Sequence, residues 1–347
     1  MLTLDQVEPH PLQKGFHKSL SHPYIFIDSC VQIWDDTDYS KLNSYGCTAF
    51  CITTFRPDDD HPGNAMDSIS NWYRISNKYD EVCIAYSAQD IIDAKTNNQA
   101  AIVFASQGGD FVGRNINRLE VFHKLGLRMM IPAYNKRNSI CDGCLEPANF
   151  GLSEFGKQWV EECQRLGILI DLSHVGEKSS LEILSRAKKP VVFSHSNPKS
   201  LVDVPRAITD SQIKKCAATG GIIGITNWGP LNYKKSVTSR PTIENYIESI
   251  KYIIDLVGID HVGMGTDMSL GTYPDGDLIR GLKTTNDYSN HIESNPRSKL
   301  RYVEGFDDYG DLMNVVDCLE KIGLSEYEIK KILGDNWLRV FKDVWKN

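Results

Sequence analysis

Two histidines and one aspartate follow short apolar runs in this sequence, at positions where they could hold a metal ion. His174 follows ILIDLS, His195 ends VVFSH, and Asp267 ends HVGMGTD. Neutral imidazole is the commonest side-chain ligand of Zn²⁺-like ions, and a carboxylate can bind the ion or move a proton. One such histidine alone is as often held by a backbone hydrogen bond. The joint placement predicts a metal site with His174 and His195 as ligands and Asp267 as ligand or general base.

Three other polar side chains stand at or just beyond the ends of similar runs. Cys30 follows YIFID, Gln107 follows AIVFAS, and Tyr134 follows RMMIPA. A thiolate binds Zn²⁺ or a softer metal, so Cys30 is either a further ligand or a buried inert thiol. We interpret Gln107 as a substrate-binding residue or metal ligand, and Tyr134 as a hydrogen-bond donor to the substrate.

The apolar runs alternate with helical patterns, which is typical of parallel βαβ units. Eight such strands predict a closed (β/α)₈ TIM barrel, whose active site forms where the C-terminal ends of the strands meet. The length of 347 residues fits one such domain over 1–347. The predicted strands cover 24–28, 48–53, 101–106, 128–133, 168–173, 191–195, 221–226 and 261–267.

The segments between strands carry clear helix ends. Ser153 precedes EFGKQWVEECQRL and Gly167 follows it, as expected for an N-cap and a C-terminal glycine, and Ser325 should cap the last helix. The polar stretch 269–311 is rich in Gly, Asn and Asp, and it predicts an active-site loop or lid after the eighth strand.

Composition and charge exclude several classes of partner. The 38 Lys and Arg are outnumbered by 45 Asp and Glu, giving a net charge of −7 without a basic cluster, so a nucleic-acid partner is not expected. The N-terminal MLTLDQVEPHPLQKGF is unlike a signal peptide, and no run approaches the roughly 20 apolar residues of a membrane span. We therefore expect a cytoplasmic protein without a membrane partner.

The nine cysteines favour a reducing compartment, because they are odd in number and mostly lie within apolar patterns. Cys141 and Cys144 form a CxxC, but no second pair accompanies it. We interpret this pair as structural rather than as a zinc or redox motif.

Three longer segments resemble signatures of the membrane dipeptidase family (renal dipeptidase, peptidase M19). They are GILIDLSHVGE, PVVFSHSNPKSLVDVPRAITD and DLVGIDHVGMGTD, and the C-terminal LSEYEIKKILGDNWLRVF is similar to the closing helix of the family. With GLSEFGKQWVEECQRLG, the resemblance covers most of the chain from about Ala100 onward. A bacterial subgroup with Tyr-Asn-x-Arg-Asn on the fourth strand is more similar still.

The resemblance implies specific roles for four residues. The histidines matching His174 and His195 hold the second ion of a binuclear zinc centre. The arginine matching Arg206 binds the terminal carboxylate of the substrate, which suits its planar fork of donors. The aspartate matching Asp267 contacts the nucleophilic water as general base. Family members are often dimers, so a homodimer is implied as well.

The chain departs from the family pattern at the first metal. The family motif Asp-x-His-x-Asp is replaced by Asp28-Ser29-Cys30-Val31-Gln32, the bridging glutamate by Gln107, and the histidine that stabilises the oxyanion by Tyr134. A neutral amide cannot bridge two cations as a carboxylate does. We therefore expect about one divalent ion per chain, zinc or another transition metal.

These observations favour a metal-dependent hydrolase of an amide or related C–N bond in a small amino-acid-like substrate that bears a carboxylate. One alternative is a lyase or oxidase that acts on a modified amino acid through the same site. Another is a binding protein that has lost catalysis. The second alternative does not explain why Arg206, His174, His195 and Asp267 are all present.

Overall fold

The structure is a computed structural model that describes residues 22–54, 61–234, 240–272 and 299–345. The N-terminal segment and the centre of the predicted lid, 273–298, lie outside the described residues. The described flanks of this predicted lid contain a short strand, Met268–Leu270, and 3₁₀ turns at Lys299–Arg301 and Tyr309–Asp311.

The strands follow the predicted order, and every pair of them is parallel. Two predictions need correction. The predicted strand at 191–195 contributes only isolated bridges, and a short additional strand, β3, lies beside β4. The strands are β1 (Ile27–Ile33), β2 (Ala49–Thr53), β3 (Val82–Ile84), β4 (Ala100–Ser106), β5 (Leu127–Met130), β6 (Leu169–Ile170), β7 (Ile223–Ile225), β8 (Val262–Met264) and β9 (Met268–Leu270).

Two parallel sheets and single bridges between them surround the barrel axis. One sheet has the order β6-β5-β4-β2-β1-β9, and β7 pairs with β8 in a second. Single bridges from Asp171 to Val192 and from Phe193 to Ile223 connect β6 to β7. β9 continues the chain from β8 and pairs with β1 through Met268 and Val31, which closes the circuit. The predicted (β/α)₈ barrel is therefore confirmed.

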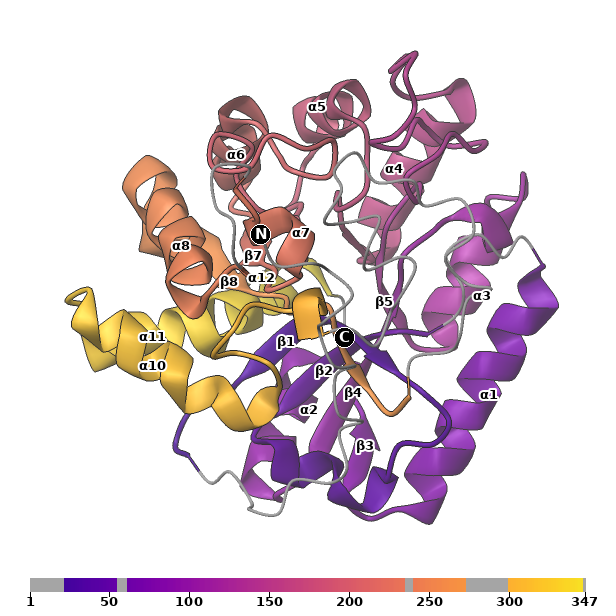
Figure 1. Cartoon of the computed structure of the whole chain (residues 1–347). Helices are drawn as coiled ribbons and strands as arrows, with labels where there is room; N and C mark the ends of the chain where they lie inside the picture. The colour runs from indigo at the N-terminus through magenta and orange to yellow at the C-terminus, as the bar shows by residue number, and fades with distance from the viewer. Residues whose placement is uncertain (1–21, 55–60, 235–239, 273–298, 346–347) are drawn as a thin grey trace.

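Helices surround the strands on the outside (Figure 1). They bury the outward faces of the strands, as the alternation of elements predicts. The longer helices are α1 (Pro62–Lys78), α2 (Ala88–Thr96), α3 (Arg118–Lys124), α4 (Glu154–Leu166), α5 (Glu177–Arg186), α6 (Asp210–Ala218), α8 (Ile243–Val257), α10 (Leu312–Lys321) and α12 (Asn336–Val344). Shorter pieces are α7 (Gly229–Asn232) and α11 (Glu326–Lys330).

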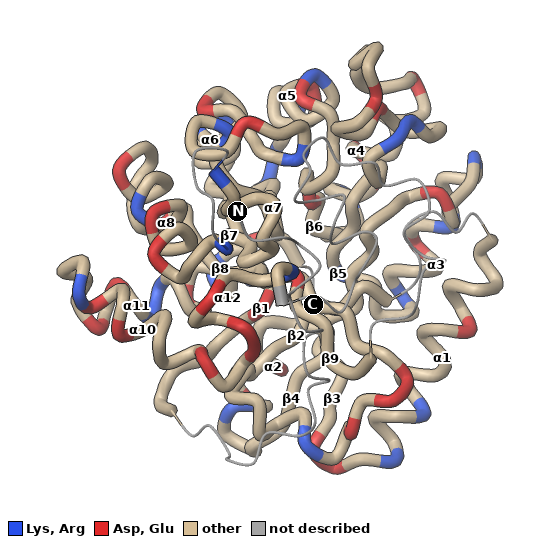
Figure 2. The backbone as a smooth tube through the Cα atoms, viewed as in Figure 1, with Lys and Arg blue, Asp and Glu red and all other residues tan. Residues whose placement is uncertain are grey.

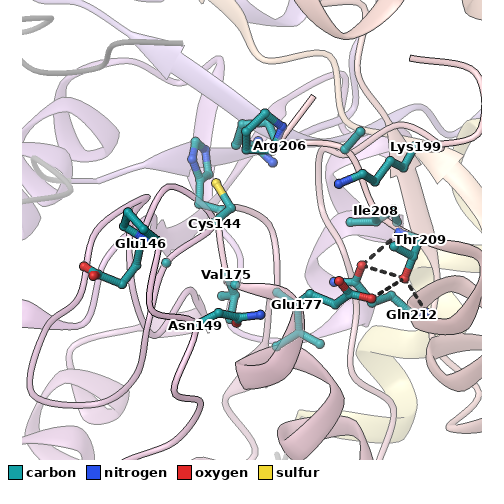
Figure 3. A pocket seen from close by; sticks show the side chains of 17 residues that line it. Cys144, Glu146, Asn149, Val175, Glu177, Lys199, Arg206, Ile208, Thr209 and Gln212 are labelled. Atoms are coloured by element: carbon teal, nitrogen blue, oxygen red, sulfur yellow. Dashed lines mark hydrogen bonds between the residues drawn. The ribbon is translucent and has the colours of Figure 1, made fainter. Parts of the chain in front are cut away.

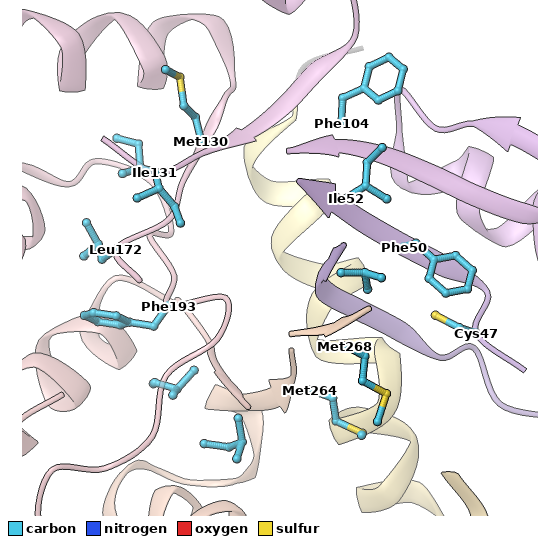
Figure 4. Close-up of a cluster of buried hydrophobic side chains, with 14 of the residues drawn as sticks. Cys47, Phe50, Ile52, Phe104, Met130, Ile131, Leu172, Phe193, Met264 and Met268 are labelled. Atoms are coloured by element: carbon cyan, nitrogen blue, oxygen red, sulfur yellow. The ribbon is translucent and has the colours of Figure 1, made fainter. Parts of the chain in front are cut away.

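Alternate residues of β2 and of β4 belong to two separate hydrophobic clusters. On β2, Phe50 and Ile52 join the outer cluster between strands and helices, part of which Figure 4 shows, whereas Ala49 and Cys51 join the inner one. The period of two follows from the pleat of a strand. The inner cluster includes Trp337 of α12, so this helix packs against the interior of the barrel.

The predicted helix ends are confirmed. Ser153 accepts a hydrogen bond from the Gly156 amide at 2.9 Å, and Gly167 ends α4 with a left-handed φ of 86°. Ser325 forms a capping box with Glu328 at the start of α11. These contacts satisfy backbone groups that a helix leaves unpaired at its ends.

Acidic and basic residues are interspersed over the outer helices (Figure 2). Among the described residues, no helix combines the length and the apolar character needed to cross a membrane.

Gly334, just before α12, lies close to the backbone of Ile25, and a substitution there tests how tightly this part of the chain packs against the barrel. A Cβ there would lie 2.2 Å from the Ile25 carbonyl oxygen. We expect Gly334→Ala to lower the free energy of unfolding by about 1–3 kcal/mol, because overpacking forces the backbone to move. Chemical denaturation measures this change. Lys342→Ala, at an exposed position of α12, is the control and should change stability by less than about 0.5 kcal/mol. Equal stability of the two variants would contradict the prediction.

Candidate functional site

Three residues near the strand ends adopt left-handed backbone conformations. They are Asn135 with φ 59°, His174 with φ 67° and Asp267 with φ 58°. Such conformations cost on the order of 1–3 kcal/mol for residues other than glycine and persist only where the surroundings enforce them. Asp267 lies between β8 and β9, so the predicted eighth strand, 261–267, ends earlier, at Met264, and a further short strand begins directly after Asp267.

His174 and His195 meet across adjacent strand ends, as the sequence predicts. Their Nε2 atoms are 2.9 Å apart, and both rings are buried. The Nδ1 of His174 lies 2.7 Å from Asn135 Oδ1, and the Nδ1 of His195 lies 2.6 Å from Ser194 Oγ.

The hydrogen-bond partners fix the protons on both rings. Asn135 Oδ1 only accepts, so His174 carries its proton on Nδ1. The Ser194 hydroxyl donates to Asp171, so its oxygen accepts from His195 Nδ1. Burial, with the nearby Arg206 charge, holds the pKa of both histidines well below its usual value, so both rings are neutral. Two Nε2 lone pairs then face each other, an arrangement that repels unless a cation lies between them.

Cys30 turns into the same space because of a bulge in β1. The register of β1 against β2 shifts between Asp28 and Val31, so Ile27 joins the inner cluster and Val31 the outer one. A β-bulge commonly redirects a side chain in this way. Cys30 thereby lies among the candidate site residues.

Three side chains at the positions where the family resemblance implies first-metal ligands lie around Asp267. Gln32 Nε2 donates to Asp267 Oδ1 at 3.2 Å, and the Cys30 thiol contacts the same oxygen at 3.6 Å. Gln107 Nε2 donates to Cys30 Sγ at 3.0 Å. Hydrogen bonds between neutral groups and one carboxylate therefore occupy this side of the site.

Cys30, His195 and Asp267 also form a group with the spacing of metal ligands. One potential ligand atom from each lies within 4.8 Å of the others. Burial, followed by the Asp267 charge, raises the pKa of Cys30 well above its usual value, and burial also raises the pKa of Asp267. A bound cation would act in the opposite direction and favour the thiolate.

Two buried aspartates brace the strands that carry these ligands. Asp28 accepts hydrogen bonds from the Thr266 amide at 2.8 Å, from the Thr266 hydroxyl and from Tyr309 Oη at 2.8 Å. Asp171 accepts from the Ser194 amide at 2.8 Å. Burial raises the pKa of Asp28 to about 6, while the hydrogen bonds from Thr266 and Tyr309 oppose that shift.

Arg206 is 6% exposed and lies beside the histidines. Its guanidinium donates to the His195 carbonyl at 3.0 Å and to Ser196 Oγ at 3.4 Å. Among the described residues it forms no salt bridge with a carboxylate. Arg206 and His174 both line a cavity of about 250 Å³ (Figure 3). A buried guanidinium facing a cavity without an acidic partner is suited to bind an anionic ligand.

Tyr134 packs against the candidate metal ligands. Its ring lies over that of His174, with centroids 4.0 Å apart and planes inclined by 30°. All predicted site residues are therefore near one another: Cys30, Gln107, Tyr134, His174, His195, Arg206 and Asp267.

Sequence reasoning missed the residues that orient the histidines. Asn135 and Ser194 directly adjoin the predicted Tyr134 and His195, and this adjacency was the available signal. Cys141 and Cys144 of the CxxC motif form no disulfide in the described part of the chain, and they lie in a loop, where the sequence placed them. Cys144 contacts Asn135 Oδ1 at 3.2 Å, so this cysteine also borders the site.

The arrangement combines nitrogen, sulfur and oxygen ligand types around His195 with a basic group beside them. Zn²⁺ binds this mixture of ligands. A cation at this position would polarise a carbonyl or lower the pKa of a water molecule. Because Asp267 lies near His195, it would also lie near a water molecule on a cation held there. Its carboxylate could then exchange a proton with that water molecule or with a leaving group.

Comparisons with known proteins show the family of this chain. Residues 27–294 match the membrane dipeptidase family (peptidase family M19). The dipeptidase tcpJ of Claviceps purpurea is 28% identical over 267 residues, which are 76% of this chain and 56% of that protein. This chain therefore spans little more than half the length of that relative.

Solved structures extend the likeness. An amidohydrolase from Pseudomonas aeruginosa superposes with a TM-score of 0.80 at 30% identity, covering 93% of this chain and 97% of that one. A metallo peptidase from Rhodobacter sphaeroides, solved with a phosphinate mimic of the dipeptide L-Ala-D-Ala, has a TM-score of 0.75 at 17% identity and covers 93% and 99%. The latter likeness concerns the fold alone. From the family match and the likeness to the amidohydrolase, this chain is a member of the membrane dipeptidase family, peptidase family M19.

Proposed function

We propose that this protein is a metal-dependent hydrolase that cleaves an amide C–N bond in a small, dipeptide-like substrate bearing a carboxylate. The observation that carries this proposal is the pair of buried histidines whose Nε2 atoms are 2.9 Å apart. Such a pair, with Nδ1 protons engaged by Asn135 and Ser194, is suited to bind a cation.

His174 and His195 would hold the ion, and Cys30 and Asp267 are the candidates to complete the ligand set. Zn²⁺ fits these residues because it accepts nitrogen, sulfur and oxygen ligands in a four-coordinate site. M19 dipeptidases are metal-dependent and typically use zinc. When bound, the ion would supply Lewis-acid activation of the carbonyl or of water.

We further propose that the site holds one ion rather than two. The positions where the family resemblance implies His, Asp and Glu ligands for the first ion carry Cys30, Gln32 and Gln107. These side chains engage one another and Asp267 through hydrogen bonds. Neither glutamine supplies the negative charge that a second divalent cation would require.

The remaining residues would bind and orient the substrate. Arg206 would receive its carboxylate through a bidentate contact. Tyr134 would donate a hydrogen bond to the carbonyl oxygen as negative charge develops there. Asp267 would take a proton from the attacking water and return one to the leaving nitrogen. The names of the dipeptidase relatives support a peptide-like substrate.

Metal content tests the ligand assignment. We expect about one tightly bound divalent ion per chain in the purified protein, and none in His174→Ala or His195→Ala, because the two rings share one ion. Elemental analysis measures this, and circular dichroism checks the fold. His123→Ala, in helix α3, is the control and should retain the ion. Two tight ions per chain in the wild-type protein would contradict the proposal.

Substrate docking gives a second test. Arg206→Lys keeps the positive charge but loses the planar fork, so we expect KM to rise by about tenfold or more while the ion is retained. Steady-state kinetics with metal analysis separates these two effects. Arg186→Lys, on the surface of α5, is the matched control. An unchanged KM in Arg206→Lys would contradict the proposal that Arg206 binds the substrate carboxylate.

Turnover of ordinary dipeptides should be weak even with added zinc. Losing one cation removes a strong electrostatic stabiliser of the transition state, a loss on the order of a thousandfold in rate. A panel of dipeptides and N-acyl amino acids measures kcat/KM. Combining Cys30→His, Gln32→Asp and Gln107→Glu should raise both metal content and dipeptide turnover. Fast dipeptide hydrolysis by the wild-type protein with one bound ion would show this reasoning wrong.

A further inference from the structure

The cavity beside His174 and Arg206 contains charged side chains that the proposed reaction does not use. It lies between the loop that includes Cys144 and Glu146 and the segment that includes Lys199 and Thr209 (Figure 3). Its volume of about 250 Å³ leaves room for more than a single carboxylate group.

The two acidic side chains of this cavity interact with other protein groups. Glu177 Oε1 accepts a hydrogen bond from Thr209 Oγ1 at 3.3 Å. Glu146 lies 4.0 Å from the Arg137 guanidinium, and in Figure 3 its carboxylate points away from Arg206. Neither acid pairs with Arg206 or with Lys199 in the described part of the chain.

Lys199 is the second cation of the cavity. Its Nζ atom lies 3.5 Å from Asp203 Oδ1, but the Asp203 side chain is 84% exposed, and surface pairs of this kind contribute little. Figure 3 shows the Lys199 amine directed into the cavity, with the apolar Ile208 beside it. Arg206 and Lys199 therefore present positive charge to the same cavity.

We propose that this cavity is a subsite for a second carboxylate, so that the preferred substrates carry an acidic residue at their carboxyl-terminal side. Arg206 receives the α-carboxylate, as in the proposed function on which this inference rests. Lys199 receives the side-chain carboxylate, and Ile208 contacts the methylene groups between them. Lys199 is thus a specificity-determining residue.

Glu146 and Glu177 also line this cavity, but at the position between Arg206 and Lys199 the two cations favour this class over others. A basic side chain would face Arg206 and Lys199, and repulsion between like charges would weaken its binding. A neutral amide of the same shape would leave the Lys199 charge without an anionic partner. An acidic side chain gains a charge-assisted hydrogen bond in the same position.

Binding of two matched probes tests this subsite without requiring turnover. N-acetyl-glutamate and N-acetyl-glutamine have nearly the same shape and differ in one charge. By calorimetry on the full metal-loaded chain, we expect the acid to bind about tenfold more tightly than the amide. In Lys199→Met this ratio should fall to about one while affinity for the amide is unchanged, and Lys199→Arg should keep the preference.

Lys188→Met is the matched control, because it removes the same charge at an exposed position outside the cavity lining. It should retain the wild-type preference. If both probes bind equally to the wild-type protein, or if Lys199→Met keeps the full preference, the subsite is refuted while the proposed function stands. If neither probe binds, the docking role of Arg206 in the proposed function fails, and the subsite fails with it.

Discussion

The carboxylate of Asp28 joins the first strand of the barrel to the last, and the candidate site depends on this junction. It is fully buried and accepts hydrogen bonds from Thr266 and Tyr309, which lie more than 230 residues away in the chain. A buried carboxylate is costly unless its hydrogen bonds are made, so the first and last strands are held in one register. That register brings Asp267 next to Cys30.

A second buried carboxylate, that of Asp171, positions His195 through Ser194. Asp171 accepts from the amide and the hydroxyl of Ser194, which leaves the Ser194 oxygen to accept from His195. The same barrel that positions the strands therefore also selects the tautomer of a candidate ligand. The left-handed backbone at His174 and Asp267 is enforced by these surroundings, which is where such strain is expected to persist.

The side chains at the positions where the family resemblance implies ligands of a first metal ion form one connected group. Cys30, Gln32 and Gln107 come from the ends of two strands, yet they contact one another or Asp267. These side chains satisfy one another's hydrogen bonds in a buried space. Neutral groups hydrogen-bonded around Asp267 therefore form one side of the candidate site, and the cavity lined by Arg206 and Lys199 forms the other.

The sequence alone predicted the barrel, most of its strands and the seven candidate site residues. Apolar runs that alternate with helical patterns indicate the buried strands, and polar residues at the ends of these strands indicate the face where the candidate site lies. It could not supply contacts that depend on closure of the barrel. The β1 bulge that turns Cys30 inward, the early end of the eighth strand at Met264, the Asn135–His174 hydrogen bond and the Ser194–Asp171 hydrogen bonds all depend on partners distant in the chain. Local sequence patterns do not predict the direction of the Lys199 side chain. They also do not predict that Arg206 has no acidic partner among the described residues. Tertiary packing decided these features, because burial and charge pairing are properties of the assembled barrel.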